Sequence, residues 1–297
     1  MSTLKYSLYV LLGACSYGLL SVLVKLAYQE GFNIDEVIGS QYLFGFFFIL
    51  IPFIILKKKV TLKEGVMLAI AGTTTSLTGL LYAKSLETIP ASIAIVLLFQ
   101  FTWIGIVLDM IISRKWPDKE KLISVVILFL GTILASGGLT NKLFMYEISG
   151  IIYGLLSAVS FALFIVFSGR VAVTQTSIVR SFFMSTGALL FVLLLFSPDF
   201  MFNGSLGEGL WVYGALLGFF GVLLPVLLFS IGTPKIGGGL ATIIGAAELP
   251  TAVIASALIL NEHVSFIQVI GVIIILIGVA FPQLQYMKLK GRKPANL

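Results

Sequence analysis

Residues 237–262 read GGGLATIIGAAELPTAVIASALILNE, a stretch that is long and apolar enough to cross a bilayer and that carries one carboxylate, Glu248, near its middle. A charged side chain at the bilayer centre costs roughly 2.5–3.5 kcal/mol on insertion scales, so such a residue is a candidate functional group. At helical spacing, small residues such as Gly245, Thr251 and Ala252 share its face. Such a face lets a second helix approach closely or leaves room for a cavity. The alternative is a protonated Glu248 that hydrogen-bonds between helices and only holds the bundle together.

Two prolines predict breaks in the helices of this region. Pro250 cannot donate a hydrogen bond to the carbonyl of Ala246, so we expect a free acceptor one turn from Glu248. Pro225 lies within another apolar run and is expected to kink it or to free the carbonyl of Gly221. Because broken helices supply binding groups in secondary transporters, both prolines are candidate hinges or helix breaks.

The composition is that of a protein that crosses the membrane many times. Of the 297 residues, 59% are hydrophobic and 11% are charged, whereas soluble domains have about 25% charged residues. About 20 helical residues span the hydrocarbon core. Hydropathy predicts ten such spans, at roughly 6–27, 35–56, 65–86, 91–112, 121–139, 147–169, 178–197, 211–232, 237–260 and 265–286. The predicted fold class is therefore all-α and integral to the membrane, with no room for a soluble domain.

The charges in the loops predict the orientation. If the N-terminus is cytoplasmic, 16 of the 19 lysines and arginines lie on the cytoplasmic side, and Lys25, Lys84 and Lys142 lie outside. Cytoplasmic loops carry the excess of Lys and Arg, so we predict that both termini are cytoplasmic and that residues 289–297 form a basic cytoplasmic tail. This topology explains the net charge of +6 without nucleic-acid binding. The predicted location is the cytoplasmic membrane.

An internal repeat divides the chain. Residues 11–19, LLGACSYGL, align with residues 155–163, LLSAVSFAL, at an offset of 144. Each copy begins a run of five spans, so we predict repeats at 1–140 and 146–288. Because five is odd, the second copy enters the membrane from the opposite side, which makes the repeats inverted, as in many secondary transporters. Chance similarity between two Leu- and Ala-rich helices is the alternative.

This organisation resembles the drug/metabolite transporter superfamily, in its EamA-like branch. Residues 81–94, LYAKSLETIPASIA, resemble the family's junction between the third and fourth helices of a repeat, and residues 248–262 resemble the end of its fourth helix. Two departures stand out: a leucine separates Glu248 from Pro250, and the first copy has no matching proline but reads FQFTW at 99–103. The resemblance implies export or uptake of small metabolites.

Aromatic and polar residues at membrane depth are further site candidates. Gln100 is expected to face protein or a cavity, because an unpaired amide in hydrocarbon is costly. Trp103, on the same face, lies too deep for the interfacial belt and either stacks on a substrate or fills a gap between helices. Tyr82 has a hydroxyl that needs a partner, and Tyr17 and Phe161 occupy matched places in the two copies, as candidate walls of one cavity. The predicted substrate-binding set is Glu248, Gln100, Trp103, Tyr82, Tyr17 and Phe161.

The residues give no support for catalysis. The sequence contains no glycine-rich phosphate cradle followed by lysine, no histidine spacing for a metal, and no nucleophile with a visible base. With one histidine and one cysteine, the chain is expected to hold neither a metal nor a cofactor. Asp109 is expected to be a hydrated or paired charge rather than a ligand.

We therefore predict a secondary transporter, not an enzyme. It would move a small metabolite (an amino acid, an amine or a drug-like solute, with export favoured) across the lipid bilayer by alternating access, with Glu248 at the midplane and a coupling proton as an option. The alternative is a non-transporting membrane protein, such as an assembly partner or a membrane enzyme, in which Glu248 packs helices. Two fused repeats can complete a pathway within one chain, so a monomer suffices and a dimer is left open.

Overall fold

The computed structural model describes residues 2–56, 58, 60–89, 91–136 and 147–291. Over these residues the chain is almost entirely helical and contains no strand. Nine helical segments in this part of the chain are long and apolar enough to cross a membrane. The predicted class, an all-α integral membrane protein, is therefore confirmed. The end of the predicted span 121–139, Lys142 and residues 292–297 of the predicted basic tail lie outside the described residues.

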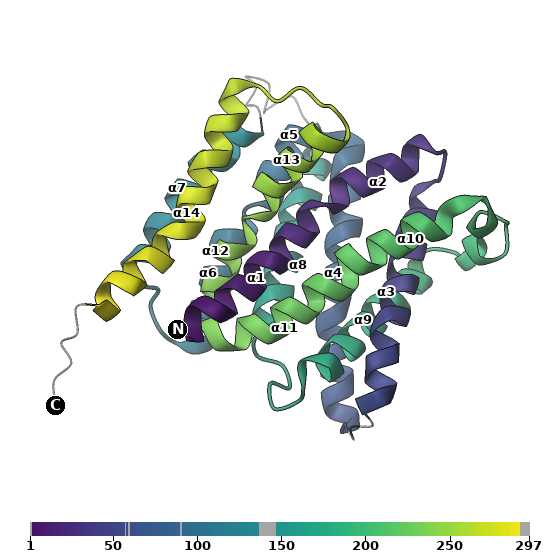
Figure 1. Cartoon of the computed structure of the whole chain (residues 1–297), viewed down its shortest axis with the longest axis horizontal. Coiled ribbons are helices and arrows are strands. Elements are labelled where there is room, and N and C mark those ends of the chain that lie inside the picture. The colour runs from purple at the N-terminus through teal and green to yellow at the C-terminus, as the bar shows by residue number, and fades with distance from the viewer. Residues whose placement is uncertain (1, 57, 59, 90, 137–146, 292–297) are drawn as a thin grey trace.

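The helices follow the predicted spans, although several spans consist of two helices (Figure 1). The first half of the chain contains α1 (Ser2–Gly18), α2 (Leu20–Gln29), α3 (Ile34–Leu56), α4 (Leu62–Thr88), α5 (Ala91–Leu98), α6 (Phe101–Ser113) and α7 (Lys119–Ala135). The second half contains α8 (Ile148–Ser168), α9 (Ser177–Leu195), α10 (Trp211–Gly218), α11 (Leu224–Ile236), α12 (Gly238–Gly245), α13 (Glu248–Ile259) and α14 (Phe266–Gly291). Helix α7, described over 17 residues, runs beside α14 and corresponds to the fifth predicted span, 121–139 (Figure 1).

Local sequence signals set several helix ends. Thr61 caps α4, because its side chain accepts a hydrogen bond from the backbone N–H of Glu64 while the Glu64 carboxylate accepts one from the backbone N–H of Thr61. Gly237 separates α11 from α12 with a φ of 85°, a conformation that glycine adopts without strain. The eighth and ninth spans therefore meet in a tight corner.

Three predicted spans are interrupted within their length. The first breaks at Leu19, between α1 and α2; the fourth breaks at Phe99 and Gln100, between α5 and α6; and the ninth breaks at Ala246 and Ala247, between α12 and α13. The backbone stays in the right-handed helical region at these places, with φ −74° and ψ −21° at Leu19 and φ −60° and ψ −16° at Gln100, so each span remains one membrane-long helical segment. Irregular turns of this kind change the local hydrogen bonding inside a membrane protein, and such places often line binding sites.

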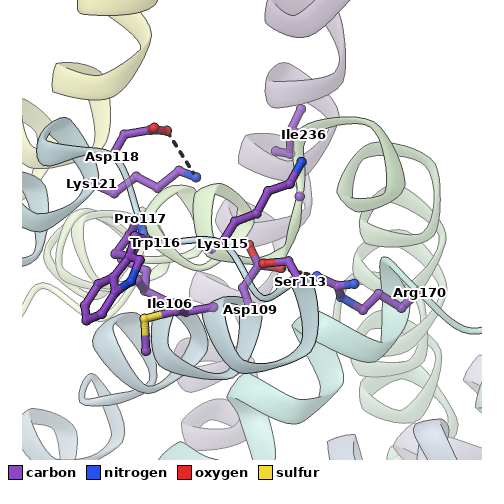
Figure 2. A pocket seen from close by; sticks show the side chains of 13 residues that line it. Ile106, Asp109, Ser113, Lys115, Trp116, Pro117, Asp118, Lys121, Arg170 and Ile236 are labelled. Carbon is purple, nitrogen blue, oxygen red and sulfur yellow. Dashed lines mark hydrogen bonds and ion pairs between the residues drawn. The ribbon is translucent and has the colours of Figure 1, made fainter.

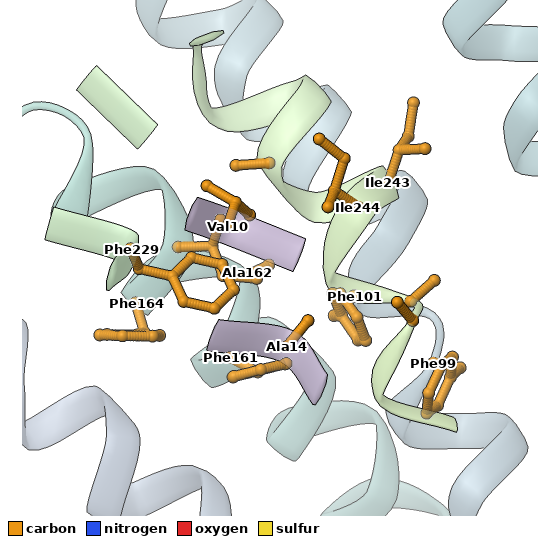
Figure 3. Packing of buried hydrophobic residues seen from close by; sticks show 14 of the residues in the cluster. Val10, Ala14, Phe99, Phe101, Phe161, Ala162, Phe164, Phe229, Ile243 and Ile244 are labelled. Atoms are coloured by element: carbon orange, nitrogen blue, oxygen red, sulfur yellow. The ribbon is translucent and has the colours of Figure 1, made fainter. Parts of the chain in front are cut away.

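Phenylalanine rings fill the interior near these breaks (Figure 3). The ring centroid of Phe101 lies 4.7 Å from that of Phe161, Phe161 lies 6.1 Å from Phe164, and Phe164 lies 5.7 Å from Phe229. These side chains come from α6, α8 and α11 and are almost fully buried. Phe101 also packs on Gly245, the last residue of α12. The aromatic row therefore joins both halves of the chain beside the break in the ninth span.

Candidate functional site

Glu248 is the first residue of α13, directly after the break in the ninth span. Its backbone carbonyl lies against Gly18: a Cβ atom there would come within 2.5 Å of the Glu248 oxygen and 2.6 Å of the Thr251 Cβ. A side chain at position 18 would therefore force α1 and α13 apart. The small-residue face predicted around Glu248 is a close helix contact, and it places Glu248 where the breaks of the first and ninth spans meet.

The carboxylate of Glu248 has an oxygen without a polar partner. Its Oε2 is buried and makes no hydrogen bond to any described residue. The next two residues, Leu249 and Pro250, are buried, while Glu248 keeps part of its surface accessible. An unpaired carboxylate away from bulk water is costly. Because a bound proton or a bound cation removes that cost, Oε2 has the properties of a binding atom.

Two tyrosines lie near this carboxylate, and a third lies near one of them. Tyr17 on α1 and Tyr82 on α4 both lie within electrostatic range of Glu248. Tyr42 on α3 lies near Tyr17 and beside the hydroxyl of Thr75. The hydroxyl of Tyr17 is buried and, like Oε2, lacks a hydrogen-bond partner in the described part of the chain. The candidate site thus combines an unpaired carboxylate oxygen, an unpaired hydroxyl and aromatic rings.

Tyr17 and Phe161 lie in contact. Their ring centroids are 5.6 Å apart at an interplanar angle of 78°, an edge-to-face pair, and Tyr17 also approaches Phe164 and Phe229 at 6.4 and 6.2 Å. The two matched residues therefore make one continuous aromatic wall and do not face each other across a cavity, as the sequence analysis had suggested. Phe161 is 6% exposed, so this wall is part of the buried interior.

Gln100 and Trp103 do not join this group by any contact that the structure describes. The Gln100 amide is satisfied within its own span: Nε2 donates to the carbonyl of Val96 at 2.7 Å, and Oε1 accepts from Trp103 Nε1 at 2.8 Å. Trp103 is 43% exposed and continues a row of exposed apolar side chains with Val107 and Ile111. Such a row on a membrane-spanning helix is typical of a bilayer-facing surface. The expected shared face is present, but it is an outer face, because Phe101 takes the inner one.

Pro225 follows a π-helical turn, but the helix does not end there, because Leu206–Ile236 form one continuous helical segment. A π-helical turn, Phe219–Leu223, directly precedes α11. The carbonyl of Phe220 in this turn accepts a hydrogen bond from Ser16 Oγ on α1 at 2.5 Å. A π-helical turn leaves carbonyls without their regular partners, and here a side chain of the first span replaces one of them.

Pro250 lies in the first turn of α13, three residues after the helix actually breaks. The carbonyl of Ala246, which was expected to be free, accepts a hydrogen bond from the backbone N–H of Leu249 at 3.3 Å. That expectation is wrong, because the chain tightens locally into a bond between residues i and i+3. The site beside Glu248 therefore depends on the side-chain oxygens and not on a free backbone acceptor.

Two interior residues were missed from the sequence. Tyr42 adjoins Gln41, a second buried polar residue in an otherwise apolar span, and this polar pair was the available signal. Arg180 on α9 was counted only as a cytoplasmic charge, because it lies near the predicted start of a span. In the structure it is 1% exposed. The burial of Arg180 depends on contacts with other helices, and the local sequence does not indicate these contacts.

All three kinds of guanidinium nitrogen in Arg180 are occupied. Nε donates to the carbonyl of Val171 at 3.1 Å, Nη1 donates to the carbonyl of Ser230 at 2.6 Å, and Nη2 donates to the carbonyl of Ser168. The Ser230 carbonyl lies four residues before Pro234, which has no N–H to offer it. Arg180 therefore joins α8, α9 and α11 and has a structural role.

Comparisons with known proteins agree with this fold. The chain is 25% identical over 300 residues, covering 97% of it and 95% of the relative, to a Bacillus subtilis (strain 168) protein named "Uncharacterized transporter YcbK". A solved structure described only as "Crystal structure of protein" aligns with a TM-score of 0.74 at 15% identity, covering 96% of this chain and 99% of that one, so the two share the fold. The model of the EamA-like transporter family matches residues 4–137 and again residues 148–282. The chain therefore belongs to the EamA-like transporter family.

Proposed function

We propose that this membrane transporter carries a small amine-bearing solute and that Glu248 binds the amine. The observation that carries the proposal is the buried Oε2 of Glu248, which has no partner in the described chain and lies near the equally unpaired hydroxyl of Tyr17. An ammonium group donates three hydrogen bonds, and its positive charge balances the negative charge of a carboxylate that is away from water. The aromatic rings of Tyr17 and Tyr82 add favourable faces for a cation.

The same chemistry ranks the substrate classes. An acidic solute would be repelled by Glu248, and an amino acid would need a second, cationic group for its own carboxylate. The buried cation Arg180 cannot supply that group, because its nitrogens already donate to three backbone carbonyls. An amine without a carboxylate therefore fits better than an amino acid.

Alternating access by two inverted five-helix repeats, at 1–140 and 146–288, is the proposed mechanism. Two observations support it. The family model matches the chain twice, once in each half. The helix contacts also come in matched pairs: α1 packs on α11 as α8 packs on α4, and α3 packs on α10 as α9 packs on α4. Inverted repeats of this kind bind substrate at the midplane and rock around it.

The positive-inside pattern supports a cytoplasmic-membrane location with both termini cytoplasmic. Amine and proton would compete for Glu248, so each would leave the site when the other binds. We propose that the amine is exported in exchange for a proton that enters the cell. One chain supplies both repeats, so a monomer is sufficient for transport, and a dimer remains compatible with it. The rival role of Glu248, a hydrogen bond that only packs helices, is not supported, because Oε2 lacks such a bond among the described residues.

A flux assay tests the proposal. Purified protein in proteoliposomes is given radiolabelled tyramine, putrescine, phenylalanine or succinate, with and without an imposed pH gradient. We expect uptake of one or both amines, little of succinate, and loss of amine flux in Glu248→Gln. The matched control is Glu208→Gln, which neutralises an exposed glutamate of the same half. Equal amine flux in wild type and Glu248→Gln, or flux of succinate alone, would reject the proposal.

A further inference from the structure

Two ion pairs lie at opposite ends of the helix bundle. At one end, Arg170 Nη2, just after α8, lies 2.7 Å from Asp109 Oδ1, near the end of α6. At the other end, Lys25 Nζ on α2 pairs with Glu262 Oε1, just after α13. Asp109 was expected to be a hydrated or paired charge, and in the structure it is paired with a residue 61 positions away in sequence. Within the described residues these pairs connect separate spans, whereas the pair of Lys121 and Asp118 is local.

The two pairs join equivalent helices of the two halves. Lys25 ends the first span of the first half, and Arg170 follows the first span of the second half, one residue from the position that the repeat offset of 144 gives. Glu262 and Asp109 end the fourth spans of the second and first halves. Each pair therefore ties the first span of one half to the fourth span of the other, once at each end of the bundle.

The candidate amine site lies between them. Lys25 is eight residues after Tyr17 on the first span, and Asp109 is eight residues after Phe101 on the fourth, which is about 12 Å of helix in each case. Tyr17 and Phe101 both pack on Phe161. A solute bound near Glu248 would therefore have one pair between it and each side of the membrane.

The Arg170–Asp109 pair lines a cavity of about 420 Å³ (Figure 2). Asp109 lies against the first residues of α12, since a Cβ atom at Gly239 would lie 3.2 Å from Oδ2. The positive end of a helix dipole favours a carboxylate there. Asp109 is therefore held both by Arg170 and by the N-terminus of α12, so this pair binds three elements together.

The two pairs differ in exposure. The Lys25 and Glu262 side chains are 52% and 41% exposed, whereas those of Arg170 and Asp109 are 35% and 17% exposed. Exposed ion pairs are screened by water and salt and contribute little. The Arg170–Asp109 pair is therefore the less screened and the stronger of the two.

We propose that these ion pairs are the two gates of the transport path, Arg170–Asp109 on the cytoplasmic side and Lys25–Glu262 on the outer side. The inference rests on the proposed transport function. Breaking one pair opens its own end and, because the halves move as alternating bodies, favours closure of the other. A role that is only structural would loosen one end and leave the other unchanged.

Spin-label distances test the proposal without any substrate. In a Cys15→Ala background, which removes the single cysteine, labels are placed at the exposed positions Thr174 and Lys119 for the cytoplasmic end. A second protein carries labels at the exposed positions Gln29 and His263 for the outer end. Distances are measured by double electron–electron resonance in lipid bilayers.

The variants are Asp109→Asn and Glu262→Gln. We expect Asp109→Asn to raise the open fraction at the cytoplasmic end roughly three- to fivefold and to lower it at the outer end. Glu262→Gln should do the reverse, by about twofold. The double exchange of Asp109→Arg with Arg170→Asp should return the distances toward wild type. Asp118→Asn is the matched control, because Asp118 lines the same cavity but, among the described residues, pairs locally with Lys121 in the first turn of α7.

The possible outcomes separate the two claims. If neither variant changes its own end, or if both ends respond in the same direction, the gate proposal is wrong, whatever the flux assay gives. If the distances shift in opposite directions while the wild type moves none of the four probe solutes, the gates stand and the amine proposal fails. If Asp118→Asn acts like Asp109→Asn, the effect is one of cavity charge and the gate assignment is overturned.

Discussion

Arg180 and Glu248 are both charged side chains inside the helix bundle, but the protein surrounds them in opposite ways. Arg180 donates to three backbone carbonyls, so its charge is fully used in holding helices together. Glu248 keeps Oε2 without a partner among the described residues. A buried charge is therefore not by itself evidence of function. The informative feature is the polar atom that the fold leaves unpaired.

Prolines contribute to this difference. In α11, Pro234 leaves the Ser230 carbonyl without its helical partner, and Arg180 fills the vacancy. In α13, Pro250 also removes an N–H, but the backbone of Leu249 takes the Ala246 carbonyl instead. The carbonyl left open by Pro234 therefore binds a cation, whereas Pro250 leaves the Ala246 carbonyl paired within the backbone.

The largest stability effect is expected at Arg180. Arg180→Met keeps the bulk of the side chain but leaves three buried carbonyls without their donor, which we expect to cost about 3 kcal/mol or more of folding stability. Thermal unfolding in detergent, followed by tryptophan fluorescence and size-exclusion chromatography, measures the loss. The control is Arg114→Met, at an exposed arginine. An unchanged unfolding temperature in Arg180→Met would contradict the structural role assigned to Arg180.

In contrast to Arg180→Met, Glu248→Gln is expected to reduce transport without reducing stability. Amine flux should fall roughly tenfold to hundredfold, because a charge-assisted contact to the substrate is lost. Stability should stay within about 1 kcal/mol of wild type or rise, because a neutral amide costs less to bury than a charge. Initial rates in proteoliposomes and unfolding of the same preparation test both parts. A large loss of stability would instead assign Glu248 to helix packing.

Tyr17→Phe sharpens the comparison on the aromatic side. The Tyr17 hydroxyl is unpaired in the described structure, so its removal should not reduce stability. If the Tyr17 hydroxyl binds the amine, KM should rise roughly fivefold in Tyr17→Phe, because one hydrogen bond to the substrate is lost. Tyr213→Phe, on α10, is the control. A KM unchanged within error, together with higher stability, would make Tyr17 a packing residue only.

The smallest effect is expected at Trp103. Trp103→Leu removes an exposed side chain whose indole N–H bonds only to Gln100, so flux should change by less than about twofold. Phe101→Leu, two residues earlier on the buried face, should reduce flux and stability together. A tenfold loss in Trp103→Leu with normal stability would place the substrate on this face and contradict the arrangement described above.

The membrane spans were predictable because the thickness of the hydrocarbon core sets how many consecutive apolar residues a spanning helix needs. The spans follow from runs of apolar residues, and Glu248 stood out because a carboxylate in such a run is rare. Side-chain surroundings were not predictable in the same way. Helical spacing correctly placed Gln100 and Trp103 on one face, but which face turns inward depends on Phe101 packing against α8 and α12. The Arg170–Asp109 pair joins residues 61 positions apart, so no local pattern indicated it.

The central claim is that the unpaired oxygen of Glu248 binds an amine, and equilibrium binding tests it most directly. Isothermal titration calorimetry in lipid nanodiscs would compare tyramine, putrescine and succinate on wild type and Glu248→Gln. The account predicts that the wild type binds at least one amine and not succinate, and that the substitution weakens amine binding tenfold or more at unchanged stability. Equal amine affinity for the two proteins, or binding of succinate in preference to both amines, would contradict it.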